Sequence, residues 1–167
     1  KKILIWYDNN HRTLPWRISK NSKKKHYYRL LSEFMLQQTQ VKTVIPYFNN
    51  FVKKIPNLKA LSNSSEKKVL KLWEGLGYYR RAKNLHKTSK VLMSKHGGKI
   101  PSDFFALKEL PGIGDYTANI LLALIYNQPR IGLDGNVKRV FYRLFNSANL
   151  DVINLIKTKR NCDLAEA

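Results

Sequence analysis

Residues 110–139 contain the feature that most limits how this chain can fold. A Leu-Pro-Gly-Ile-Gly turn comes first, then a long apolar run, then an isolated acid. Glycines such as Gly112 and Gly114 let a turn between two helices approach a nucleic-acid backbone, and amides at the next helix start donate to phosphate. Asp134 follows 20 residues after Gly114, beyond the run Ile120 to Ile125, which we expect to be buried on all sides. The stretch predicts two helices joined by a phosphate-binding hairpin, with a carboxylate close behind.

The rest of the hydrophobic pattern is also helical. Apolar residues recur at three- and four-residue intervals, and no convincing run alternates as a strand would. The periodic segments are 27–35, 41–52, 69–76, 82–93 and 137–144. Residues 20–26, rich in lysine, serine and asparagine, indicate a solvated loop. Residues 146–160 are polar and weakly patterned, so we expect a long connection there, with a short helix at most. The predicted fold class is all-α.

Composition narrows the choice of partner and setting. Lysine and arginine total 31 against 11 acids, a net charge of +20, which favours a polyanionic partner such as nucleic acid. No segment resembles a membrane span, a membrane-surface helix or a signal peptide, so we expect no membrane partner and a cytoplasmic protein. One cysteine, Cys162, rules out an internal disulfide or a cysteine-ligated metal site. The chain starts on Lys1 and stops in mid-pattern, as a fragment would.

On spacing alone, the candidate site residues have two interpretations each. Glu33 lies at the edge of an apolar stripe, where it is either a solvated helix residue or a partly buried carboxyl with a raised pKa. Asp134 precedes Gly-Asn-Val and suits a helix N-cap as well as a catalytic role. Leu76 and Tyr78 suit core packing, Tyr116 suits packing at a helix start, and Arg17 suits a surface charge.

Six further blocks of sequence reduce this ambiguity, and with the hairpin they cover roughly residues 4–145. The chain resembles the catalytic part of adenine DNA glycosylases of the MutY family, within the helix-hairpin-helix glycosylase superfamily. The blocks Met-Leu-Gln-Gln-Thr-Gln and Gly-Leu-Gly-Tyr-Tyr are what favour the adenine-excising branch. The matching blocks are 14–17, 32–41, 44–48, 72–79, 84–87 and 96–99, followed by the hairpin and the Asp134 block.

This resemblance implies a two-carboxylate mechanism. Cleaving the N-glycosidic bond of adenine leaves positive charge on the sugar and negative charge on the base, so one acid must donate a proton and one must stay ionised. By resemblance Glu33 protonates adenine, Asp134 stabilises the sugar, and Asn136 supports Asp134 by hydrogen bonding. The implied substrate is double-stranded DNA with adenine opposite 8-oxoguanine or guanine, and the implied pathway is base excision repair.

The resemblance also separates this chain from glycosylases that cut the strand. In the related endonuclease III group, a lysine at the position of Tyr116 forms a Schiff base with the sugar, which tyrosine cannot do. A monofunctional enzyme follows. Gly112 and Gly114 would contact the DNA backbone through the hairpin, and Lys138 would contact a phosphate.

Recognition of the mispair is implied for another group of residues. The target adenine must leave the duplex, and other groups must fill the gap. By resemblance Gln38 and Thr39 lie at the opposite 8-oxoguanine, Leu76 and Tyr78 wedge beside it, and Arg17 lies near the adenine pocket. On a short alignment of residues 163–167, Glu166 would also contact adenine.

The chain departs from the family at its C-terminal end. It lacks the C-x6-C-x2-C-x5-C cysteines that hold a [4Fe–4S] cluster in full-length relatives, so we expect no cofactor in this chain. Nor does it contain the C-terminal domain that helps recognise 8-oxoguanine. We expect a monomer in which residues 1–26 form an N-terminal helix and basic loop of an incomplete lobe. Residues 27–145 would form a six-helix catalytic domain with the helix-hairpin-helix at about 107–125. Residues 146–167 would begin a truncated, incomplete second lobe.

Two alternatives to an adenine glycosylase stay open at this point. One is a non-catalytic DNA-binding module that keeps the hairpin but has lost activity through truncation. The other is a thymine-mismatch glycosylase of the same superfamily, because such relatives share the tyrosine.

Overall fold

The computed structural model describes residues 2–18, 24–144 and 146, and all regular elements in that part are helices. The predicted all-α class is therefore confirmed. Backbone contacts group the chain into two units, divided between His86 and Lys87. The domain boundaries expected from the sequence stay predictions. Among the described helices, none combines the length and apolar character that a membrane crossing requires.

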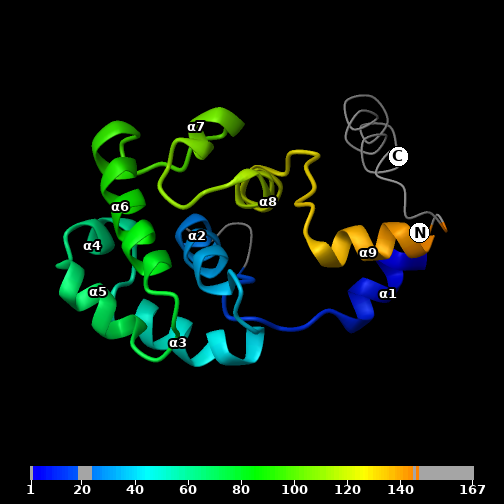
Figure 1. The fold of residues 1–167 in the computed structure, drawn as a ribbon, viewed down its shortest axis with the longest axis horizontal. Coiled ribbons are helices and arrows are strands. Elements are labelled where there is room, and N and C mark those ends of the chain that lie inside the picture. Colours follow the sequence, from blue (N-terminus) through cyan, green and yellow to red (C-terminus); the bar gives the residue numbers. More distant parts are fainter. Residues whose placement is uncertain (1, 19–23, 145, 147–167) are drawn as a thin grey trace. The chain divides into compact units, whose positions relative to one another are not determined.

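The first unit is built on three helices, of which the middle one contacts the other two. Helix α2 (Lys25–Leu36) packs on α3 (Val41–Lys54), and α3 packs on α5 (Glu66–Trp73), as Figure 1 shows. Helix α1 (Lys2–Asn10), α4 (Leu58–Ser62) and the start of α6 (Arg80–Lys95) complete it. The core side chains have no exposed surface, and each stabilises the fold by about 1.5–3 kcal/mol. They include Leu30, Leu31, Phe34, Met35, Val44, Phe48, Phe51, Val69 and Trp73.

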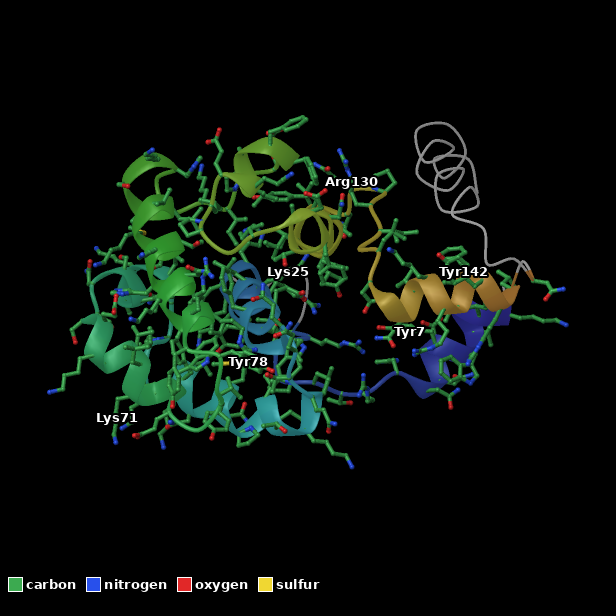
Figure 2. The ribbon with its side chains drawn as sticks, viewed as in Figure 1. Tyr7, Lys25, Lys71, Tyr78, Arg130 and Tyr142 are labelled. Atoms are coloured by element: carbon green, nitrogen blue, oxygen red, sulfur yellow. The ribbon has the colours of Figure 1, made fainter. Side chains whose placement is uncertain are left out.

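The expected solvated loop at 20–26 is wrong at its C-terminal end. Helix α2 begins at Lys25, two residues before the apolar stripe that we used to place it, and Lys25 is only 7% exposed (Figure 2). A lysine can bury its methylene stem while its charged end reaches a polar environment. The run of charged and polar residues at 20–26 therefore did not mark the start of α2.

The second unit contains the hairpin. Helix α7 (Phe104–Lys108) packs on α8 (Asp115–Tyr126), and α9 (Gly135–Leu144) follows after a connection (Figure 1). Helix α6 ends where Gly97 and Gly98 take positive φ angles and the Gly98 amide donates to the Leu92 carbonyl over 2.9 Å. The Thr88 hydroxyl then donates to the Pro111 carbonyl over 2.8 Å, which ties α6 to the hairpin.

Helix α8 is not buried on all sides, contrary to the sequence expectation. Leu121, Leu122 and Ile125 are at most 5% exposed, but Leu124 on the same helix is 36% exposed. A short run that is wholly apolar has no periodicity to show which face is covered, and apolar residues are common on protein surfaces.

Candidate active site and nucleic-acid interface

The hairpin places the start of α8 at an exposed surface. The buried side chains of Leu110 and Ile113 anchor it, and Gly112 takes a φ of 81° at its turn. The first intrahelical bond of α8 runs from the Ala118 amide to the Gly114 carbonyl over 2.9 Å, so the amides before Ala118 have no partner within the helix. A Cβ added at Gly114 would meet no atom within 4 Å. This open approach suits a phosphate oxygen.

Asp134 is the N-cap of α9. Its Oδ1 accepts from the Val137 amide over 2.8 Å, and its Oδ2 accepts from the Asn136 side-chain amide over 3.2 Å. Arg139 in turn donates to Asn136 Oδ1 over 2.6 Å. These donors come from the next five residues of the chain, so the local sequence sets the orientation of the Asp134 carboxylate.

The connection from α8 to α9 passes directly against Tyr116. Gly132 is buried, and a Cβ added there would lie 2.7 Å from Tyr116 Cε2 and 2.5 Å from Ile120 Cγ1. Glycine therefore lets the segment that leads into Asp134 lie against the tyrosine ring. Tyr116 itself is 40% exposed, and it lines a polar pocket together with Lys138.

Glu33 lies on α2, in an environment unlike that of Asp134. Burial raises its pKa to about 7 from the ordinary 4.5, and the charge of Arg29, one turn earlier, opposes that rise. The pKa of Arg29 is lowered by burial and by the charge of Arg17, and is raised by Glu33 and Tyr7. Arg17 donates to the Arg12 carbonyl over 3.1 Å, with its guanidinium 5.9 Å from the Tyr7 ring centre. Sequence reasoning missed Arg29, although its spacing of four residues from Glu33 was a usable signal.

Arg81 joins two loops, the one that follows α2 and the one that follows α5. The resemblance implies a role in mispair recognition for residues of both loops. Its guanidinium donates to the carbonyls of Phe34, Met35 and Gln37 at the end of α2, and to those of Leu76 and Gly77 after α5. It also lies over the rings of Trp73 and Tyr78, 5.6 and 5.2 Å from their centres. Sequence reasoning missed this residue, because nothing local links it to carbonyls more than 40 positions earlier.

The residues of these two loops differ in how they are presented. Gln38 is exposed with a φ of 57°, and the Thr39 hydroxyl donates to the Gln37 carbonyl over 3.4 Å. Tyr78 has a φ of 48° and is 61% exposed, whereas Leu76 is 6% exposed. In this structure the ring of Tyr78 is largely exposed to solvent, and the side chain of Leu76 is packed in the protein.

Comparison with known families identifies the chain. Residues 31–160 match the family described as "HhH-GPD superfamily base excision DNA repair protein". The chain belongs to the HhH-GPD superfamily. It is 48% identical over 145 residues to an adenine DNA glycosylase of Buchnera aphidicola subsp. Baizongia pistaciae, covering 86% of this chain and 40% of that one. It is 41% identical over 147 residues to the adenine DNA glycosylase of Mus musculus, covering 85% and 28%. The resemblance to adenine DNA glycosylases is thus confirmed, and the chain spans two fifths or less of these two relatives.

Solved structures of the superfamily share the fold. A thermostable thymine-DNA glycosylase matches with a TM-score of 0.80 at 23% identity, over 95% of this chain and 74% of that one. A non-covalent endonuclease III–DNA complex matches with a TM-score of 0.71 at 21% identity, over 90% and 70%. The predicted helix-hairpin-helix glycosylase fold is confirmed.

The structure of this HhH-GPD chain distributes the predicted residues between the two units. Glu33, Arg17, Gln38, Thr39, Leu76 and Tyr78 belong to the first, and Tyr116, Asp134, Asn136, Lys138 and the hairpin glycines to the second. Glu166 and Cys162 lie outside the described residues. With one cysteine, the chain does not supply the four thiolates that a [4Fe–4S] cluster needs. No cluster of His, Cys, Asp and Glu suited to a metal ion occurs among the residues that could be described.

Proposed function

We propose that this chain contains the chemistry that removes adenine mispaired with 8-oxoguanine or guanine in double-stranded DNA. The observation that carries the proposal is the identity of 48% and 41% to two relatives named adenine DNA glycosylase. Glu33, on a helix whose following turn holds Gln38 and Thr39, supports it, because burial raises the pKa of this carboxyl to about 7. Near neutral pH a substantial part of this carboxyl is protonated, which is the form that can donate to a leaving base. The identity to relatives named adenine DNA glycosylases supports adenine as that base.

The proposed reaction is hydrolysis of one bond. Glu33 gives its proton to a ring nitrogen of adenine, the bond between the sugar carbon and the base breaks, and the electron pair leaves with adenine. Water then adds to the sugar carbon and loses a proton, which leaves an abasic site.

Asp134 is proposed to stabilise the cationic sugar. Its carboxylate is held by a backbone amide and by Asn136, so it needs no rearrangement as positive charge develops. With its two oxygens already oriented, the carboxylate would stabilise positive charge at the sugar in an oxocarbenium-like transition state.

Strand cleavage is not part of the proposed activity. A phenol at Tyr116 does not form the imine that a lysine forms with the opened sugar. The ring has a packing role against Gly132, and the hairpin before it would hold DNA phosphates through the amides of α8.

Recognition of the mispair is proposed to involve the two loops that Arg81 joins. Gln38 and Thr39 carry polar groups suited to a base edge, and the exposed ring of Tyr78 suits stacking. Since Arg81 bonds to carbonyls next to both loops, it would keep their spacing fixed when the duplex opens.

Single-turnover release of base from a duplex with one adenine opposite 8-oxoguanine tests the proposal. We expect free adenine and an alkali-labile abasic site, no strand cleavage before alkali, and loss of release in Glu33→Gln. A parallel duplex with thymine opposite guanine tests the thymine alternative. DNA binding without release of either base would indicate a binding module and would overturn the proposal.

A further inference from the structure

The second unit contains a polar pocket of about 410 Å³, and its lining includes Lys138, for which the resemblance implies a phosphate contact. Its walls come from α7, α8, the connection after α8, and the first turn of α9. The lining residues are Phe104, Asp115, Tyr116, Asn119, Arg130, Ile131, Leu133 and Lys138. The pocket therefore lies between the start of the hairpin's second helix and the segment that leads into Asp134.

The charge of the pocket is set by two cations. Arg130 and Lys138 both line it, and the acid among the lining residues, Asp115, has its carboxylate 2.7 Å from the ammonium of Lys108 outside the lining. Lys108 thus offsets the charge of Asp115. The two remaining cations favour an anionic occupant.

Arg130 is held in place by contacts on both its backbone and its side chain. Figure 2 shows it in the connection that follows α8. Its amide donates to the Gln128 carbonyl over 2.7 Å, and Gln128 donates to the Ser102 carbonyl over 2.8 Å, which anchors the segment near the start of α7. Its guanidinium lies 5.8 Å from the centre of the Phe104 ring. Stacking on an aromatic face restricts the guanidinium while its N–H groups stay available in the ring plane.

We propose that Arg130 and Lys138 form a subsite for one phosphodiester group of the DNA strand that carries the target nucleotide. The ligand class rests on the proposed function, and the contact of Lys138 with a phosphate is already implied by the resemblance. The subsite adds Arg130 as a second ligand of that phosphate, at a position distinct from the hairpin amides. Lys138 is one helical turn after Asp134 and Arg130 is four residues before it. A phosphate bound between them belongs to a nucleotide adjacent to the one whose sugar meets Asp134.

The first test measures DNA affinity as a function of salt for Arg130→Gln. Loss of one phosphate contact lowers the slope of log K against log salt by about one. Arg143→Gln is the matched control, because it removes the same charge from an exposed position of α9 outside the pocket. Arg130→Lys keeps the charge and should keep the slope, and circular dichroism checks that each variant is folded.

The second test locates the phosphate. Duplexes with one neutral methylphosphonate at successive positions around the adenine are bound by the wild type and by Arg130→Gln. We expect a methylphosphonate at one position next to the target nucleotide to weaken DNA binding by the wild type. At that same position, the methylphosphonate should weaken binding by Arg130→Gln little further. That coupling at a single position distinguishes a phosphate subsite from general attraction by surface charge.

Two results would overturn the subsite: a salt slope for Arg130→Gln no lower than that of Arg143→Gln, or the absence of any position with coupling. Adenine release is recorded in parallel on the same duplexes. Coupling without release would leave the subsite standing and overturn the proposed function, whereas release without coupling would do the reverse.

Discussion

Glu33 in the first unit and Asp134 in the second are carboxyl groups with opposite environments. Glu33 lies within a helix, and burial raises its pKa to about 7. Asp134 lies at a helix start and accepts hydrogen bonds from the Val137 amide and from Asn136. Burial raises the pKa of Glu33, whereas the donors to Asp134 hold its carboxylate in one orientation. The same functional group is thus a desolvated acid in one unit and an oriented hydrogen-bond acceptor in the other.

The two environments also have different origins in the sequence. The donors to Asp134 follow it within three residues, so the capping geometry is local. The environment of Glu33 depends on how α2 packs against other helices, since desolvation is the main cause of its shifted pKa. Substitution of Asp134 should therefore change base release with little effect on folding. Substitution of Glu33 should also change the stability of the folded state.

The largest expected effect is on base release by Asp134→Asn. Asparagine is as good an N-cap as aspartate, so we expect α9 to stay folded while the rate falls by about 10²–10⁴. The matched control is Asp103→Asn, because Asp103 caps α7 with the same kind of bond, to the Ala106 amide over 2.9 Å. A control with a similar loss of single-turnover rate would show that capping, not the charge at Asp134, supports release.

Arg81→Met should have the largest effect on stability. The substitution keeps much of the volume but leaves carbonyls at the end of α2 and after α5 without their donor. We expect a loss of about 3 kcal/mol in the free energy of unfolding by urea. Arg80→Met serves as the control, because Arg80 is exposed and adjacent. Equal losses for both variants would contradict the role given to Arg81.

Arg81 and Asp134 also show what the sequence could reveal. Helical periodicity predicted α2, α3, α5, α6 and α9, and the hairpin and the Asp134 cap followed from short-range patterns. The contacts of Arg81, the start of α2 at Lys25 and the exposed Leu124 depend on tertiary packing, which spacing along the chain does not encode. Glu33 is intermediate, since its place at the edge of a stripe suggested burial but not the size of the pKa shift.

The stability of the wild type should depend on pH through Glu33. Its folded-state pKa, about 7, exceeds the ordinary 4.5, so the folded state binds more protons between those values and stability falls as pH rises through them. The cost above pH 7 is about 3 kcal/mol. We expect the gain in stability of Glu33→Gln over the wild type to grow from pH 5 to pH 8. A constant difference in urea unfolding would be inconsistent with the raised pKa.

The rate of adenine release should show the same group. If protonated Glu33 is the donor, release at saturating DNA falls by about tenfold per pH unit above the pKa of about 7. Single-turnover rates between pH 5.5 and 9 measure this limb. A rate that is flat up to pH 9 would remove Glu33 from the role of acid.

The smallest effect is expected from Gly132→Ala, which tests how the connection into Asp134 lies against Tyr116. The added methyl would overlap Ile120 and the tyrosine ring. Because the methyl meets Ile120 Cγ1 and the tyrosine ring rather than the end of a flexible side chain, we expect a loss of about 1–3 kcal/mol in stability. The release rate should fall several-fold, since the shift displaces the segment two residues before Asp134. Ile120→Ala in the same chain should restore part of that rate by opening the space, whereas Gly135→Ala, where a Cβ meets nothing within 4 Å, should not alter stability in this way. If Ile120→Ala restores nothing, the contact with Gly132 does not position Asp134, and the local cap alone determines the environment of that carboxylate.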